Sequence, residues 1–153
     1  MTPAELQDYL LKHIPLSRAL AVEVLEVSEA RVAVVAPLAP NLNHRQTAFG
    51  GSVASVAILA GWGWLHARLA DLALDGRVVI QRQEMDYVTP IDAALTATCV
   101  APGALAWALF ARALKSRGRA RIELHVKVTC RDLLAARFVG TYVALRGESL
   151  AAG

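Results

Sequence analysis

The sequence predicts an α+β domain in which an antiparallel six-stranded sheet wraps around one long central helix. Residues 47–74 would form a helix that is apolar on nearly every face, and no charged residue occurs between Gln46 and Leu65. A helix of that kind must be buried all round. Six other segments have the composition or alternation of β-strands, and a twisted antiparallel sheet with one apolar face can curl around the helix.

Length and composition predict a single domain. The chain has 153 residues and a formal net charge of +3, so we expect one domain over residues 1–153, with a flexible tail at 146–153. The basic residues are mostly scattered, which gives no indication of a nucleic-acid partner. Cys99 and Cys130 lack metal-ligand or disulfide spacing and indicate core thiols in a reducing compartment. With no basic and apolar leader visible around Glu5, we expect a cytoplasmic protein.

The first elements are a helix and a hairpin. Thr2, Pro3 and Glu5 have the pattern of an N-cap, a first-turn proline and a capping-box glutamate, and Pro15 ends the helix. The segments 19–27 and 31–38 are rich in β-branched residues and are separated by three residues, which predicts a hairpin. A loop rich in proline and asparagine then leads to the central helix.

Four further elements follow the central helix. The segments 78–88 and 94–100 predict two strands, which we expect to pair as a second hairpin. Residues 104–114 predict a short helix that ends at Gly118. The strand at 120–131 alternates strictly, so that one face is apolar and the other polar, and a last strand is expected at 137–145.

The apolar stretch also has the length of a membrane span, since about 20 residues at about 1.5 Å each cross a bilayer core. Several glycines and serines dilute it, however, and its flanks show no one-sided basic bias. We therefore predict no membrane span, and a small membrane protein is the alternative from another class. A single copy would leave sheet edges open, which predicts a homodimer or a dimer of dimers.

Five short motifs, in order along nearly the whole chain, resemble one family. The order of elements resembles the hotdog fold of acyl-CoA and acyl-carrier-protein thioesterases, and the motifs resemble those of YiiD-type thioesterase domains. The resemblance implies a dimeric or tetrameric protein that hydrolyses, or at least binds, a fatty acyl thioester. The motifs are Ala48-Phe49-Gly50-Gly51-Ser52, Leu59-Ala60-Gly61-Trp62-Gly63, Tyr87-Val88-Thr89-Pro90-Ile91, Gly118-Arg119-Ala120-Arg121-Ile122 and Gly140-Thr141-Tyr142-Val143-Ala144.

The start of the central helix is the expected site. Thioester hydrolysis needs a polarised carbonyl and a base that activates water. A helix N-terminus offers free N–H groups with a partial positive charge, and Gly50 and Gly51 let a carbonyl oxygen approach them. The same glycines would also serve a tight entry into a crowded helix.

The resemblance also shows a departure. Many hotdog thioesterases have a His before the Gly-Gly pair, an Asn ahead of that His, and an acid about two turns into the helix. Asn43 holds the position of the Asn and is expected to place or activate water. Phe49 replaces the His and Ile58 stands where the acid would be, so the base of that subgroup is absent.

Replacement bases are few. His44 has a suitable intrinsic pKa of about 6.5, although a solvated loop histidine is the favoured interpretation. Glu84 and Asp86 share one face of a strand and would enter the site from either subunit, or would lie on the surface. Tyr87 is expected to shape the acyl pocket or to pack at a dimer seam.

Two serines lie in the first turns of the central helix. Ser52 and Ser55 are candidates to contact substrate, but no Gly-x-Ser-x-Gly motif supports a nucleophile, and bonding of Ser52 to helix backbone is the favoured interpretation.

The run of Lys115, Arg117, Arg119 and Arg121 is the one local basic cluster. Arg117 and Arg119 are expected to hold the phosphates of coenzyme A or an acidic carrier protein, or else to form a solvated face. No metal-ligand spacing or phosphate loop occurs, so neither a metal nor a cofactor is expected. The sequence therefore predicts an acyl-CoA or acyl-carrier-protein thioesterase, with a non-catalytic acyl-CoA-binding module as the alternative.

Overall fold

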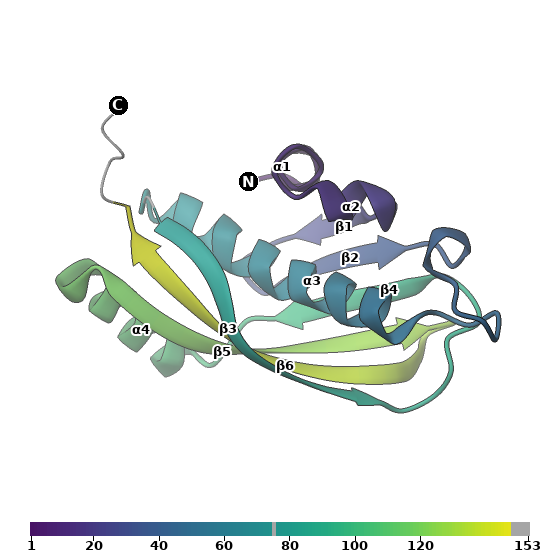
Figure 1. Ribbon diagram of the computed structural model, residues 1–153. Helices are drawn as coiled ribbons and strands as arrows, with labels where there is room; N and C mark the ends of the chain where they lie inside the picture. Colours follow the sequence, from purple (N-terminus) through teal and green to yellow (C-terminus); the bar gives the residue numbers. More distant parts are fainter. Residues whose placement is uncertain (75, 148–153) are drawn as a thin grey trace.

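A computed structural model describes residues 1–74 and 76–147, in which six strands form one sheet around α3 (Figure 1). The predicted fold class is confirmed. The elements in chain order are α1 (Pro3–His13), α2 (Pro15–Ala19), β1 (Glu23–Val27), β2 (Arg31–Ala36), a 3-10 turn (Ala39–Asn41), α3 (Gly50–Asp71), β3 (Gly76–Tyr87), β4 (Leu95–Val100), α4 (Ala104–Arg117), β5 (Arg119–Cys130) and β6 (Leu133–Arg146).

The N-terminal elements are close to the prediction, with one correction. Thr2 and Glu5 form the expected reciprocal capping box of α1. The first strand, expected over 19–27, begins only at Glu23, because a second helix that the sequence analysis did not predict ends at Ala19 and a turn follows it. Proline at a first helical position starts this helix, and the Ser17 hydroxyl donates a 2.9 Å hydrogen bond to the Leu10 carbonyl, which folds α2 back onto α1.

The sheet has the order β1-β2-β4-β5-β6-β3 and is antiparallel throughout. The predicted first hairpin, β1 with β2, is confirmed. The predicted second hairpin is wrong, because β3 lies at one edge beside β6 while β4 lies between β2 and β5. The long strands β3 and β6, of 12 and 14 residues, pair along nearly the whole of β3, whereas β4 and β2 have six residues each.

The segment between β3 and β4 is a strap rather than a tight turn. The amides of Val88 and Thr89 both donate to the Ala135 carbonyl at 2.8 and 3.1 Å, and the Ile91 carbonyl accepts from the Ala48 amide at 2.8 Å. Ile91 is buried. The strap therefore passes in front of the loop that precedes α3 before the chain enters β4.

The concave face of the sheet buries α3, as its composition predicts. Val56, Ala57, Ala60 and Leu65 are fully buried, and the buried residues of β5 alternate with exposed ones and, at Thr129, with a half-buried one. By length and composition α3 would also qualify as a membrane span, but 61% of its most apolar window is buried within the fold. The sheet thus accounts for the burial that such a helix requires.

A close crossing fixes the middle of α3 against β6. The Tyr142 hydroxyl donates a 2.9 Å hydrogen bond to the Ile58 carbonyl, and a side chain at Gly61 would overlap the Tyr142 ring. Burial raises the pKa of the Tyr142 hydroxyl far above its ordinary value. The phenol therefore stays neutral and holds the helix to the sheet.

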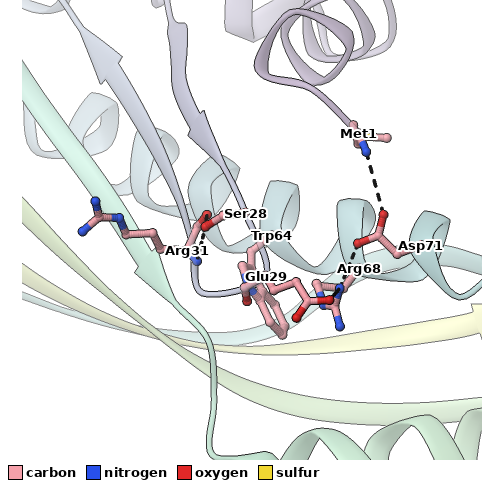
Figure 2. Close-up of polar contacts among 7 residues, drawn as sticks. All are labelled: Met1, Ser28, Glu29, Arg31, Trp64, Arg68 and Asp71. Carbon is pink, nitrogen blue, oxygen red and sulfur yellow. Dashed lines mark hydrogen bonds and ion pairs between the residues drawn. The ribbon is translucent and has the colours of Figure 1, made fainter.

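Polar contacts fix the C-terminal half of α3 (Figure 2). Arg68 donates to Glu29 at 3.1 Å and to Asp71 at 2.8 Å, and the Met1 amine lies 3.8 Å from the same aspartate. The Trp64 indole donates to the Glu29 carbonyl at 3.1 Å. These contacts join α3 to the β1–β2 turn and to the start of the chain, at the end opposite to the glycine pair.

The last part of the fold follows the prediction closely. The helix α4 runs to Arg117, and Gly118 adopts the left-handed backbone (φ 69°) that ends it. Arg146 closes β6 by donating its amide to the Gly118 carbonyl at 2.8 Å. The rest of the predicted tail, residues 148–153, lies outside the described residues. Cys99 and Cys130 are buried free thiols, as expected.

Candidate functional site

A cleft of about 470 Å³ opens where α3 begins. One wall is the start of α3 with the residues just before it, and the other is the end of β3 with the strap. The lining residues are Thr47, Ala48, Gly50, Gly51, Val53, Tyr87, Val88, Thr89, Pro90 and Ile91. The cleft therefore lies at the start of α3, where the site was expected, and Figure 1 shows the end of β3 and the start of α3 at the same side of the molecule.

The first amides of α3 carry no internal hydrogen bond. Phe49 is the N-cap residue and its side chain does not cap the helix. The Phe49 amide donates to Asn41 at 2.7 Å and the Val53 amide to Phe49 at 3.1 Å. In residues 1–74 and 76–147, nothing accepts from the amides of Gly50, Gly51 and Ser52. The partial positive charge of the helix end is therefore available to a ligand in the cleft.

Aromatic rings explain both glycines. A Cβ at Gly50 would lie 3.3 Å from Cζ of Tyr87, and a Cβ at Gly51 would overlap the Phe49 ring. The Tyr87 hydroxyl also donates to the Gly50 carbonyl at 2.8 Å. The glycine pair thus lets two rings close onto the helix tip, and both rings stay more than half exposed.

Asn43 lies in the loop before α3 and does not line the cleft. Its Nδ2 donates to Oγ1 of Thr47 at 2.9 Å, while its Oδ1 accepts from the amides of Arg45 and Thr47 at 2.7 and 3.2 Å. The side chain therefore holds the loop that leads to the glycines, a role that the sequence reasoning missed. Asparagine at the start of a polar loop was the available signal. Its placement of water stays a prediction.

The candidate bases lie outside the cleft of a single copy. His44 is exposed in the same loop, and Glu84 and Asp86 are exposed on β3. Glu84 pairs with Arg82 at 2.6 Å. Among the described residues that line the cleft, Tyr87 alone carries a titratable side chain. One copy therefore does not bring a carboxylate or an imidazole to the helix tip.

The two serines of the first turns differ. The Ser55 hydroxyl donates to the Gly51 carbonyl at 2.7 Å, one helical turn back. Ser52 is half-buried, and its hydroxyl makes no hydrogen bond to a described residue. Ser55 thus has the backbone-bonding role that the sequence reasoning favoured for Ser52.

A surface ion pair lies where the strap enters β4. Arg131 donates to Asp92 at 3.1 Å, and this hydrogen bond and charge hold the pKa of the Asp92 carboxyl below its ordinary value. The adjacent Ile91 is both buried and part of the cleft wall. Burial of Ile91 therefore fixes the strap, while the exposed ion pair adds little.

Arg117 and Arg119 lie far from the cleft within one copy. Arg119 pairs with Leu145, which pairs with Arg77 at the start of β3, whereas Tyr87 ends that strand. Ten residues of strand separate these ends by about 30 Å. A single copy therefore does not bring the two arginines to the helix tip.

Comparison with known proteins now identifies the fold family. A family model described as putative thioesterase (yiiD_Cterm) matches residues 3–146. The chain belongs to this family. The thioesterase family model spans nearly every described residue, so the resemblance of the five motifs and of the element order is confirmed.

Solved structures agree with the thioesterase family. A putative thioesterase from Shewanella oneidensis is 28% identical, with a TM-score of 0.84 over 94% of this chain and 96% of that one. A protein of unknown function from Chlorobaculum tepidum is 27% identical, with a TM-score of 0.90 over 95% and 98%. A probable thioesterase from Pseudomonas aeruginosa, 18% identical, shares the fold, with a TM-score of 0.78 over 95% and 97%. The hotdog fold is thus shown.

Proposed function

We propose that this protein hydrolyses fatty acyl thioesters of coenzyme A or of an acyl-carrier protein in the cleft before α3. The observation that carries the proposal is the set of unbonded amides at Gly50, Gly51 and Ser52, beside a cleft lined mainly by apolar groups. A cleft of about 470 Å³ has the size of a small-molecule site.

The helix tip would supply the electrostatic part of the reaction. The thioester carbonyl oxygen accepts a hydrogen bond from the Gly51 amide, and the helix end stabilises the negative charge that develops on that oxygen. One such donor contributes about 3 kcal/mol to other enzymes that stabilise an oxyanion. The rings of Phe49 and Tyr87 flank the oxygen and limit access of bulk water.

A base from outside the cleft completes the chemistry. Water attacks the carbonyl carbon and gives its proton to the base, the carbon–sulfur bond breaks, and the thiolate leaves and is protonated. Asp86 and His44 are our candidates for the base, and Asn43 places the water directly or through its loop. Both candidates are exposed, so a neighbouring subunit is needed to bring one of them to a helix tip.

The edge strand β3 supports a homodimer. Among the described strands β3 pairs with β6 alone. Since the Val88 amide bonds to Ala135, the backbone groups of Gln83, Met85 and Tyr87 face the open side. A row of open groups this long is a template for strand pairing. Two copies of β3 paired antiparallel would form a continuous sheet, either as a dimer or within a dimer of dimers.

Such a dimer gives the arginines a role. Antiparallel pairing about the middle of β3 lays the start of one β3 beside Tyr87 of the other copy. The partner's Arg117 and the partner's Arg119 then come to the side of the cleft, where they would bind coenzyme A phosphates. The same two arginines would instead bind the acidic surface of a carrier protein if that protein carries the acyl group.

The alternative is an acyl-CoA-binding module without turnover. It is favoured by one observation, the lack of a carboxylate or imidazole among the described residues that line the cleft. The two functions share the helix tip and differ only in the base, so binding and turnover must be measured separately.

A panel of acyl-CoA substrates of increasing chain length tests the proposal, with the released thiol followed by a chromogenic reagent. We expect turnover that falls at least tenfold in Asp86→Asn or His44→Gln but not in the control Asp8→Asn, an exposed acid on α1. Binding of a thioether analogue without turnover of any member would establish the module. If the protein neither binds the analogue nor turns over any substrate, both functions are excluded.

The dimer has its own test. Gln83→Pro removes an amide that faces the open side of β3 and leaves the bonds to β6 in place. Sedimentation should show loss of the dimer, and turnover should fall in parallel. A Gln83→Pro variant that is monomeric and fully active would exclude a contribution from the partner.

The cytoplasmic location is also part of the proposal and is supported by the two buried free thiols.

A further inference from the structure

Half of β5 has an unpaired edge. The strand has 12 residues, and β4 pairs only with its second half, from Cys99 opposite Val126 to Leu95 opposite Cys130. In the first half, the described strand partner is β6 alone, through contacts such as Arg121 with Val143. The chain leaves β4 after Val100 and turns into α4 instead of continuing beside β5.

The backbone direction in this half of β5 is known from one hydrogen bond. The Arg146 amide donates to the Gly118 carbonyl at 2.8 Å, so alternate residues from Gly118 onward bond to β6. The intervening residues, Arg121 and Glu123, therefore direct their amide and carbonyl groups away from β6. Nothing in the described part of the chain bonds to these four groups.

A groove of about 520 Å³ runs between this edge and α4. Arg121 and Glu123 line it on the strand side, while Ala106, Leu109 and Phe110 line it on the helix side. Leu109 is 57% exposed although it faces an apolar groove. Unpaired backbone groups thus lie beside an apolar wall, which is the combination that extended peptides use when they add to a sheet.

We propose that this groove binds an extended segment of a partner protein, which pairs with Arg121 and Glu123 as an added strand. About five residues fit the unpaired stretch, at about 3.3 Å per residue. Alternate side chains of the segment would point inward against Ala106 and Phe110, which favours small or medium apolar residues. This site is separate from the cleft and goes beyond the proposed hydrolysis.

The charged residues near the groove indicate which side chains the segment carries at its outward-facing positions. Arg121 borders the groove, and Arg112 lines an adjoining hollow of about 410 Å³. Neither arginine forms an ion pair with a described residue, whereas the Glu123 carboxylate shares a 3.0 Å hydrogen bond with the His125 ring. The accessible charge is therefore positive, so the partner segment alternates apolar residues with acidic ones.

A second copy of this chain fits the groove less well. Each copy carries α4 along this edge of β5. If two β5 edges paired with each other, the α4 helices of both copies would have to fit beside the same pair of strands. A single extended segment needs only the width of one strand, about 4.8 Å. The arrangement therefore favours a peptide segment over self-association at this edge.

Amide hydrogen exchange followed by NMR tests the proposal on the full chain. The probe is a nine-residue peptide in which valine alternates with aspartate. We expect the amides of Arg121 and Glu123 to exchange quickly in the free protein and to slow at least tenfold with the peptide, while those of Ile122 and Leu124 stay protected throughout. A matched peptide with lysine in place of aspartate should bind about tenfold more weakly.

Two controls keep the outcome specific. Ala106→Trp fills the groove and should abolish the protection, whereas Ala108→Trp, at an exposed position of α4 outside the groove, should leave it unchanged. Both variants should keep wild-type acyl-CoA binding, which separates this test from that of the proposed function. No slowing at millimolar peptide overturns the proposal. Protection in the free protein that rises with its concentration also overturns it, because a second copy would then occupy the edge.

Discussion

The Tyr87 hydroxyl donates a 2.8 Å hydrogen bond to the Gly50 carbonyl and thereby joins the last residue of β3 to the first residue of α3. The contact closes one side of the cleft, and a Cβ at position 50 would lie 3.3 Å from the Tyr87 ring, so a larger residue there would push the ring outward. Tyr87 is nevertheless 55% exposed. The ring therefore covers the start of α3 on its solvent side and can change position when a ligand or a neighbouring subunit contacts it.

Removing that hydroxyl should affect function more than stability. Tyr87→Phe loses one exposed hydrogen bond, which contributes about 1 kcal/mol. We expect kcat/KM for acyl-CoA to fall about three- to tenfold while the melting temperature changes little. Steady-state kinetics and thermal unfolding measure the two effects, with Tyr9→Phe on α1 as the control. Unchanged kinetics would show that the hydroxyl does not position the helix tip.

The overlap between Gly51 and Phe49 predicts a rescue. Gly51→Ala introduces a Cβ into the Phe49 ring, so the ring must move away from the start of α3. We expect acyl-CoA binding to weaken about tenfold, since overpacking of this kind costs about 1 to 3 kcal/mol. The double variant Gly51→Ala with Phe49→Ala should recover part of that affinity. Calorimetry with a thioether analogue measures both, and an additive loss would contradict the contact.

Asn43 is predicted to act on stability as well as on turnover. Asn43→Ala removes its hydrogen bonds to Arg45 and Thr47, and we expect the free energy of unfolding to fall by about 1 to 2 kcal/mol. Asn43→Asp keeps both acceptor bonds and should restore most of it. Denaturant unfolding measures the change. A stable Asn43→Ala variant without turnover would instead assign the amide to the water.

Acid should weaken the contact between α1 and α3. Burial lowers the pKa of His66, and the charge of His13 lowers it further; the His66 ring stacks on Trp62 at 4.6 Å and packs against Tyr9 at 4.3 Å. Because the folded pKa lies below the unfolded value of about 6.5, the unfolded chain binds more protons and stability falls as the pH drops through that value.

The measurement for His66 compares melting temperatures at pH 7 and pH 5. The fall should be larger in the wild type than in His66→Gln, which carries no titrating ring at this position. His44→Gln, in an exposed loop, is the matched control and should behave as the wild type. Equal falls in all three proteins would show that His66 does not couple to unfolding.

Cys99 should be inert in the folded protein. Burial raises the pKa of its thiol to about 12, so little thiolate exists at pH 8. We expect thiol reagents to label it only after denaturation. Above about pH 9 the Cys99 thiol ionises in the unfolded chain but not in the folded one, so the free energy of unfolding falls as the pH rises. Labelling of the native protein within minutes at pH 8 would contradict this burial.

The fold was largely predictable because two elements dominate it. The uncharged run in α3 requires burial on every side, and the alternation in β5 shows which face supplies it. The pairing of β3 was not predictable in the same way. Neighbouring strands favour a hairpin, and Pro90 resembles a turn residue, but the observed partner of β3 is β6, which lies far along the chain.

The site was predictable in part. Gly50 and Gly51 indicated the helix tip, since unbonded amides follow from helix geometry alone. The occupation of the Asn43 amide by its own loop depends on a local turn that composition does not specify. The base depends on what lies beyond β3, and a single chain does not contain that information. Assembly is thus the missing physical variable.

The position of β3 at the sheet edge also affects how the protein is made. Gly76 meets Arg146 and Tyr87 meets Ala136, so this strand leaves the ribosome long before β6 exists. During that interval α3 is not yet covered by β6, and part of its apolar surface is exposed to solvent. The nascent chain should therefore depend on chaperones until its final strand emerges, and shortening that strand should cause aggregation rather than a milder loss of activity.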